Sequence, residues 1–205
     1  MLLLVRHGQS TTNADGLLVG RTDAALTELG RTEAAAVGAL LPSVATVLTS
    51  PLRRAVATAG LAVPGISAAI EPRLVEMHYG VFDGRRAAEV TPAQWQQWRS
   101  DPDFAPEGGE SVAQVHERVT SLLEELFATH GEGARDPDAH VVAVSHVSPI
   151  KAAVAWALGG TPEMTWRMYL ANASVTAIGF GPGGPSLRAF NLVAPSPDGV
   201  PAPLR

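Results

Sequence analysis

The sequence contains no cysteine, and its only lysine is Lys151. The absence of cysteine excludes disulfide bonds, thiolate nucleophiles and zinc sites built on thiolates. All the other basic residues, of 15 in total, are arginines, whose planar guanidinium groups bind phosphate with two donors at once. The six histidines show no spacing typical of a metal-ligand set, so we expect no bound metal and no cofactor.

Long hydrophobic runs are also missing. No stretch approaches the roughly 18 consecutive apolar residues that a membrane-spanning helix needs. The apolar segment Met1–Val5 is too short for the core of a signal peptide and follows no basic residue. The net charge of −5 does not favour a nucleic acid or an anionic membrane as partner. We therefore expect a soluble cytoplasmic protein that binds anions through local positive charge.

The 205 residues, 46% of them hydrophobic, are enough for one domain with a sizeable core. Short apolar runs alternate with segments of helical periodicity. We expect strands at Leu2–Val5, Val44–Leu48, Ile66–Ile70, His140–Ser145, Val175–Phe180 and Leu187–Leu192. We expect helices at 27–41, after Pro51, and at Ala87–Arg99, Ser111–Thr129 and Pro149–Leu158. This alternation predicts a three-layer α/β sandwich, with a mostly parallel central sheet and helices on both faces. The domain should span 1–193, and the proline-rich residues 194–205 should form a flexible tail.

Two of the predicted strands end in a histidine. The first runs into Arg6-His7-Gly8, and a later one ends at Ser145 before His146. Because ligands of open α/β sheets bind at the carboxyl ends of the strands, these imidazoles should meet at one edge. Two imidazoles beside arginine suit a phosphate, and one of them can act as a nucleophile. The pattern therefore indicates phosphoryl transfer through a phosphohistidine.

Further motifs support this interpretation in a fixed order along the chain. They are Arg6-His7-Gly8-Gln9-Ser10 with Asn13, Gly20-Arg21-Thr22-Asp23, Leu26-Thr27-x-x-Gly30, Thr49-Ser50-Pro51-Leu52-Arg53-Arg54-Ala55, the segment 74–84, Gly108-Gly109-Glu110-Ser111 and Val144-Ser145-His146. Together they resemble the motifs of the histidine phosphatase superfamily, also called the phosphoglycerate mutase-like family. The resemblance covers residues 2 to about 180. It implies the phosphoglycerate mutase-like fold, with a capping insertion around 77–110.

The resemblance assigns the catalytic roles residue by residue. His7 becomes the nucleophile, and His146 donates to the phosphoryl group and stabilises its charge. Arg6 and Arg53 bind the non-bridging oxygens. Glu76 becomes the general acid that protonates the leaving alcohol. These five residues form the expected catalytic set.

The resemblance also indicates four substrate-binding positions. Ser10 and Asn13 would hydrogen-bond the phosphoryl oxygens, while Gly20 and Val147 would line the site. His78 follows Glu76 by two residues and is a further candidate for the pocket wall.

Some neighbouring residues are expected to have other roles. Arg54 is interpreted as a solvated arginine on a helix surface, because the motif of the family points to the first arginine of the pair. Asp83 and Glu110 are rivals of Glu76 for the acid role. Asp83 is expected to be structural, and Glu110 to begin a helix.

Departures from the mutase pattern favour a phosphatase. Thr12 stands where many mutases have tryptophan, Val19 where they often have threonine, and Gly84-Arg85-Arg86-Ala87 replaces a Gly-Leu-Asn-Lys stretch. The expected activity is metal-independent hydrolysis of a small phosphorylated metabolite. The alternatives are a cofactor-dependent phosphoglycerate mutase and a catalytically dead member that binds a partner. Arg85 and Arg86 are interpreted as exposed loop residues, with contact to a second anionic group of the substrate as the alternative. The alternatives for the assembly include a homodimer.

Overall fold

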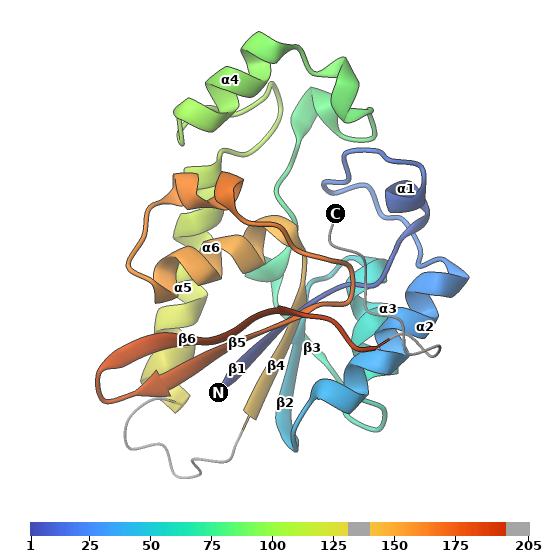
Figure 1. The fold of residues 1–205 in the computed structure, drawn as a ribbon, viewed down its shortest axis with the longest axis vertical. Coiled ribbons are helices and arrows are strands. Elements are labelled where there is room, and N and C mark those ends of the chain that lie inside the picture. Colours follow the sequence, from blue (N-terminus) through green and yellow to red (C-terminus); the bar gives the residue numbers. More distant parts are fainter. Residues whose placement is uncertain (131–139, 196–205) are drawn as a thin grey trace.

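Six strands form one mixed sheet in the computed structural model, which describes residues 1–130 and 140–195 (Figure 1). The strands are β1 (Leu2–Arg6), β2 (Val44–Thr49), β3 (Ala69–Ile70), β4 (His140–Ser145), β5 (Val175–Gly181) and β6 (Gly184–Leu192). Their order across the sheet is β3-β2-β4-β1-β5-β6. The first four in this order are parallel, β5 is antiparallel to β1, and β6 is antiparallel to β5. The sheet is therefore mostly parallel, as the sequence predicts.

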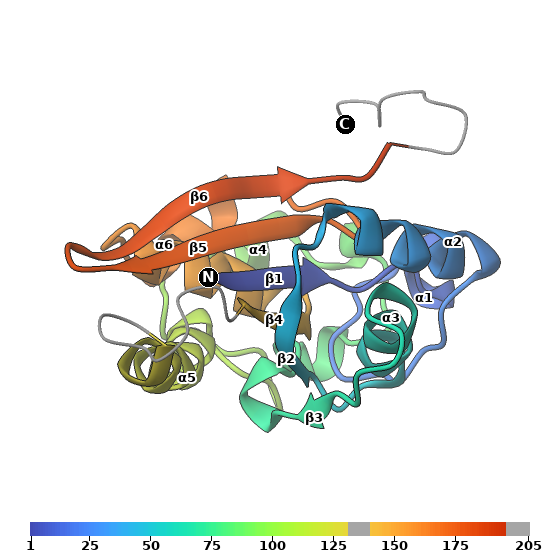
Figure 2. The same ribbon diagram turned by 90° about the horizontal axis from the view of Figure 1, so that it is seen from below.

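Helices cover both faces of the sheet, which makes the fold a three-layer sandwich (Figure 2). The α-helices are α1 (Thr11–Ala14), α2 (Glu28–Val37), α3 (Arg53–Ala62), α4 (Pro92–Ser100), α5 (Val112–His130) and α6 (Val147–Ala157). A 3₁₀ segment, η5 (Pro162–Arg167), follows α6. The pair α2 and α3 packs on one face, and the pair α5 and α6 packs on the other. None of the helices in the described ranges is both long and apolar enough to cross a bilayer.

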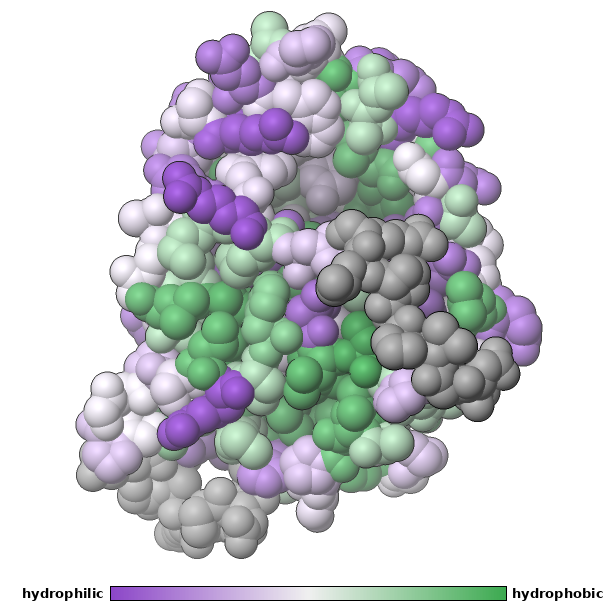
Figure 3. Space-filling view, viewed as in Figure 1, coloured by the Kyte–Doolittle hydropathy of each residue, from purple (hydrophilic) through white to green (hydrophobic). Residues whose placement is uncertain are grey.

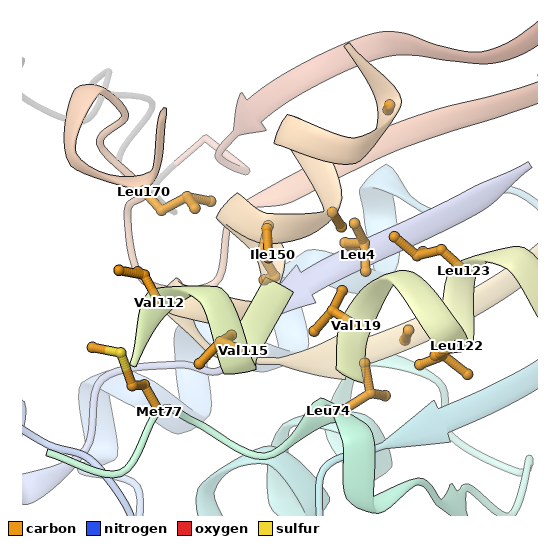
Figure 4. Packing of buried hydrophobic residues seen from close by; sticks show 14 of the residues in the cluster. Leu4, Leu74, Met77, Val112, Val115, Val119, Leu122, Leu123, Ile150 and Leu170 are labelled. Carbon is orange, nitrogen blue, oxygen red and sulfur yellow. The ribbon is translucent and has the colours of Figure 1, made fainter. Parts of the chain in front are cut away.

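The alternation of β1 explains these two layers. Leu2 and Leu4 belong to the core cluster that contains the apolar stripe of α5, and Figure 4 shows Leu4 among Ile150, Val119 and Leu123. Leu3 and Val5 belong to the second cluster, with residues of α2 and α3. A strand whose two faces are both buried carries an unbroken apolar run, which fixes β1 in the middle of the sheet.

Helix boundaries follow the capping residues. The hydroxyl of Thr27 accepts a hydrogen bond from the amide of Gly30, so Thr27 is the predicted N-cap of α2. The segment after β1 contains the short helix α1, because Ser10 and Asn13 form a capping box. The helix expected from Ala87 begins only at Pro92, after the capping residue Thr91.

The segment 77–110 rises from the carboxyl end of the sheet and carries α4, at the top of Figure 1. Phe82, Val90 and Trp98 anchor it to the core. Figure 3 shows many hydrophilic side chains over this lobe, and hydrophobic ones over the region of β6. Of the predicted tail 194–205, residues 196–205 lie outside the described part of the chain.

Candidate active site

Three neighbouring strands end at the same edge of the sheet and place His7, Ser50 and His146 together. The amide of His7 donates to the carbonyl of Ser145 at 3.0 Å, which extends the β1–β4 ladder. The amide of Ser50 donates to the carbonyl of Val144 at 2.9 Å, which extends the β2–β4 ladder. The two imidazole rings lie 5.0 Å apart between centroids. The meeting of the two histidines, predicted from the strand ends, is observed.

Gly8 allows the loop after β1 to pack directly on α2. A Cβ atom on Gly8 would collide with the carbonyl oxygen of Gly30, and a Cβ on Gly30 would collide with the carbonyl of Gln9. The amide of Gly8 donates to the hydroxyl of Thr58 at 3.1 Å. The glycines of two sequence motifs, Gly8 and Gly30, thus allow the two backbones to approach closely, and this contact fixes the position of His7.

His7 is 3% exposed and presents one nitrogen as an acceptor. Its Nδ1 donates to the carbonyl oxygen of Gly8 at 2.7 Å. A carbonyl oxygen can only accept a hydrogen bond, so Nδ1 carries the hydrogen. Its Nε2 accepts from Nε of Arg54 at 3.2 Å. Burial, with the charges of Arg6 and Arg54, holds the pKa of His7 well below its usual range. The ring is therefore neutral, with its Nε2 lone pair available, as a nucleophile requires.

His146 is fully buried and held in the complementary orientation. Its Nε2 lies 2.7 Å from the hydroxyl of Ser50, and its Nδ1 accepts from Nε of Arg54 at 3.3 Å. Burial and the neighbouring His7 and Arg54 hold the pKa of His146 well below its usual range. Nδ1 is thus the atom that faces His7 and the space shared by the two rings. Ser50, which sequence analysis did not single out, fixes this ring.

The arginine that joins the histidines is Arg54, and its expected position on a solvated surface is wrong. Arg54 is 0% exposed, whereas Arg53 is exposed and uses its backbone amide to bind Asp23 at 2.8 Å. Adjacent helix residues point about 100° apart, so only one of the two can face the site. The structure does not bring the side chain of Arg53 to the histidines, and it places Arg54 where Arg53 was expected.

Arg54 is held by the backbone of the loop before α2. Its Nη2 donates to the carbonyl of Gly20 and its Nη1 to the carbonyl of Thr22, both at 2.7 Å. The carboxylate of Asp83 accepts from three successive amides of this loop, those of Gly20, Arg21 and Thr22, at 2.8 to 3.0 Å. Asp83 therefore holds the loop whose carbonyls orient Arg54. This contact is the structural role of Asp83.

Arg6 is the second cation of the site and is half-buried. Its Nη1 donates to the carbonyl of Leu170 at 2.6 Å. Its Nε is buried and has no hydrogen-bond partner among the described residues. Burial lowers the pKa of Arg6, and the carboxylate of Glu76 opposes this effect. A buried donor without an acceptor suits an oxygen-rich anion such as phosphate.

Glu76 is 3% exposed and lies at the amino end of α6. Oε1 accepts from the amides of Met77 at 2.7 Å and Ser148 at 3.2 Å, and Oε2 accepts from the amide of Val147 at 3.1 Å. The carboxylate thus binds the free amides of the first helical turn beside His146. The structure brings Glu76 to the site, next to the predicted histidine pair.

The expected substrate-binding residues are near the site but engaged with other groups. The hydroxyl of Ser10 donates to the side-chain oxygen of Asn13 at 2.8 Å, within the capping box of α1. Gly20 offers its carbonyl to Arg54, and Val147 offers its amide to Glu76. Gly20 and Val147 therefore position the two charged groups beside the histidines.

The two rivals of Glu76 bind other groups. Asp83 accepts from the amides of the loop at Gly20, and Glu110 pairs with two arginines. Glu110 binds Arg118 at 2.8 Å and Arg21 at 3.4 Å. Burial would raise the pKa of Glu110, but the hydrogen bond and charge of Arg118 lower it overall. His78 accepts from the amide of Gly80 at 2.9 Å, within its own loop. The described residues contain no group of three or more histidine, aspartate or glutamate side chains that could hold a metal ion.

Comparison with known proteins agrees with this geometry. The model of the histidine phosphatase superfamily (branch 1) matches residues 2–193. A glucosyl-3-phosphoglycerate phosphatase of Mycobacterium tuberculosis is 37% identical over 86% of this chain and 84% of its own length. Phosphoserine phosphatase 1 of Hydrogenobacter thermophilus is 31% identical over 86% and 85%.

Solved structures give the same result. A mycobacterial glucosyl-3-phosphoglycerate phosphatase in complex with VO3 superposes with a TM-score of 0.84, at 33% identity over 93% of this chain and 98% of that chain. A phosphoserine phosphatase variant from Entamoeba histolytica, in complex with phosphoserine, superposes with a TM-score of 0.82, at 27% identity over 93% and 95%. The chain described here belongs to the histidine phosphatase superfamily, branch 1.

Proposed function

We propose that this protein hydrolyses a small phosphorylated metabolite without a metal ion, through a phosphohistidine on His7. The observation that carries the proposal is the orientation of His7. Its Nδ1–H is bound to the Gly8 carbonyl, and its Nε2 lone pair faces the space shared with His146 and Arg54. A neutral imidazole fixed by one nitrogen presents the other to phosphorus.

In the first step, Nε2 of His7 forms a bond to phosphorus, and the bond from phosphorus to the ester oxygen breaks. Glu76, as the acid form, gives a proton to the departing alkoxide. Arg6 and Arg54 neutralise the charge of the phosphoryl oxygens, which is the main requirement of such a transfer. His146 faces the same oxygens through Nδ1, and the negative charge of the bound phosphate favours the protonated ring, which donates to them.

In the second step, a water oxygen attacks phosphorus and the phosphorus–nitrogen bond breaks. The electron pair of that bond returns to Nε2 of His7, and Glu76 takes the proton from water. Inorganic phosphate then leaves. The same carboxylate thus acts as acid and then as base, so one residue beside the nucleophile is sufficient.

Hydrolysis is favoured over mutase activity. The curated relatives and solved neighbours compared above bear the names of phosphatases that act on glucosyl-3-phosphoglycerate or phosphoserine. We take an ester of this kind, a small phosphorylated metabolite, as the substrate class. A panel of phosphate esters, assayed with and without 2,3-bisphosphoglycerate, distinguishes the two reactions. A bisphosphoglycerate-dependent isomerisation that exceeds phosphate release would identify a mutase.

The positive charge of Arg6 and Arg54 replaces that of a metal ion in this proposal. Phosphate release should therefore persist in EDTA. Activity that is lost on chelation and restored by a divalent ion would overturn this part of the proposal. A cytoplasmic location is consistent with a metabolite substrate and is tested by fractionation of the source cells.

Trapping of the intermediate tests the proposal directly. Acid-free quenching of the enzyme during turnover, followed by mass spectrometry at neutral or basic pH, should find one phosphoryl group on the peptide that contains His7. His7→Gln should abolish both the adduct and turnover, while circular dichroism shows a retained fold. An adduct on another residue, or activity of His7→Gln within tenfold of the wild type, would overturn the phosphohistidine mechanism.

A further inference from the structure

A small pocket lies between α6 and the capping segment, beside the predicted acid. Its volume is about 140 Å³, and the residues that line it are Leu18, Met77, Tyr79, Trp95, Trp98, Val147, Ser148, Lys151, Thr165 and Trp166. Two of these residues, Val147 and Ser148, bind the carboxylate of Glu76 through their amides. The pocket therefore adjoins the group that would protonate the leaving alcohol, and it is suited to hold the non-phosphate part of the substrate.

The walls of this pocket are aromatic and fixed. The rings of Trp95 and Trp98 are stacked at 5.5 Å between centroids, and Trp166 packs edge-on against both, at 6.2 and 5.8 Å. Trp98 is 1% exposed. These rings come from α4 and η5, two segments that meet over α6. A rigid apolar wall of this kind limits the size of the group that can enter.

The polar groups of the lining are rich in donors. Lys151, the only lysine of the sequence, supplies an ammonium group. None of the lining residues is an aspartate or glutamate. With an ammonium group and no carboxylate in its lining, this pocket is suited to a ligand that brings negative charge.

Lys151 lies on the same helix as the amides that bind Glu76. It follows Val147 by four residues on α6, so the two side chains share a face, one helical turn apart. Lys151 is half-buried. An anionic group bound there would lie on the side of the site where the amides of Val147 and Ser148 bind Glu76.

We propose that Lys151 and this aromatic pocket form a carboxylate subsite, which selects phosphate esters whose alcohol is a short hydroxy acid. The proposal rests on the proposed phosphatase function and names the substrate class of that site. The ammonium of Lys151 donates to the substrate carboxylate, while the indole rings enclose the carbon chain between carboxylate and ester oxygen. Burial lowers the pKa of Lys151 to about 8, which leaves the ammonium form predominant at neutral pH.

Two esters that differ at one group provide the test. 3-Phosphoglycerate carries a carboxylate where glycerol 3-phosphate carries a hydroxymethyl group. The wild type should prefer 3-phosphoglycerate in kcat/KM. Lys151→Met, which keeps the length of the side chain and removes its charge, should lower this preference at least about tenfold, the effect of one charge-assisted hydrogen bond. The loss should appear mainly as a raised KM for 3-phosphoglycerate.

Arg99→Met is the matched control. Arg99 is exposed and lies over the ring of Trp95 at 5.3 Å, but it does not line this pocket. It should keep the preference of the wild type. Lys151→Arg, which retains the charge, should keep more of the preference than Lys151→Met. Thermal unfolding of each variant separates a loss of the fold from a loss of selection between the two esters. If Lys151→Met is unstable, Lys151→Gln takes its place as the neutral variant.

Three results would overturn the subsite. They are a wild type without preference between the esters, an unchanged preference in the folded neutral variant, or an equal loss of kcat on both esters. The last result would mean that Lys151 acts on Glu76 rather than on the substrate. Hydrolysis of 4-nitrophenyl phosphate, dependent on His7, would persist in each of these cases. Its absence in the wild type would instead overturn the proposed function.

Discussion

Nε of Arg54 lies 3.2 Å from Nε2 of His7, and the same nitrogen lies 3.3 Å from Nδ1 of His146. One N–H group is thus shared between the lone pairs of two neutral imidazoles. Because an N–H donor faces both rings, neither of these nitrogens carries a hydrogen. Arg54 therefore selects the tautomer of His7 that has its nucleophilic lone pair directed into the site.

We predict that Arg54→Lys lowers kcat/KM by about 10²- to 10³-fold, the usual effect of removing one group that stabilises transition-state charge. Lysine keeps a positive charge but cannot bind both carbonyls and both imidazoles with one planar group. Arg53→Lys is the matched control on the adjacent residue and should stay within about threefold, as expected for a substitution of an exposed side chain. Steady-state kinetics with 4-nitrophenyl phosphate measure both variants. The reverse order of effects would assign the role to Arg53.

The choice between these two arginines shows where sequence analysis was insufficient. The motif placed an arginine near the amino end of a helix, and the resemblance was aligned on the first of the pair. Only the position at which α3 begins decides which side chain faces the sheet. A signal was available in Ala55, Thr58, Ala59 and Ala62, small residues at helical spacing. Arg54 continues this stripe, since it precedes Thr58 by four residues, and Arg53 does not.

The fold was more predictable than the site. Continuous apolar runs located β1 and β4, and the N-cap at Thr27 located α2, because these signals are local in the sequence. The contact between Asp83 and the loop at Gly20 joins residues more than 60 positions apart. No local pattern encodes such a contact. The same is true of the pocket around Lys151, whose walls come from five separate segments of the chain.

Asp83 should act on the reaction through Arg54. Asp83→Ala removes the acceptor for three amides of the loop that carries the carbonyls of Gly20 and Thr22. We expect kcat to fall about 10- to 100-fold, since small errors in the position of a catalytic group have effects of this size. KM for 4-nitrophenyl phosphate should change less. Asp103→Ala, an exposed aspartate on the capping segment, is the control. A purely structural role would lower the unfolding temperature without the selective loss of kcat.

Glu76→Gln separates a general acid from a residue that only anchors α6. The amide can still accept a hydrogen bond from the helix through its oxygen, but it cannot give a proton to an alkoxide. We expect hydrolysis of glycerol 3-phosphate to slow by about 10²- to 10⁴-fold. Hydrolysis of 4-nitrophenyl phosphate should slow less, because a good leaving group needs less protonation. An equal loss on both esters would indicate binding or folding instead, and Asp83 and then Glu110 would become the candidates to test for the acid.

The two buried histidines should make the fold less stable in acid. In the unfolded chain, a histidine takes up a proton below about pH 6.5. In the folded protein, burial holds the pKa values of His7 and His146 well below that range, so both stay neutral as the pH falls. The unfolded state then binds more protons than the folded state, and the free energy of unfolding decreases with decreasing pH. Each histidine should contribute a slope of up to about 1.4 kcal/mol per pH unit between pH 6.5 and its folded pKa.

Urea denaturation of the wild type and of His146→Gln, from about pH 7.5 down to about pH 5, measures this slope. The variant should lose the contribution of one histidine, and its curve should become parallel to that of the wild type as the pH approaches about 7.5. Equal slopes for the two proteins below pH 6.5 would contradict a neutral, buried His146.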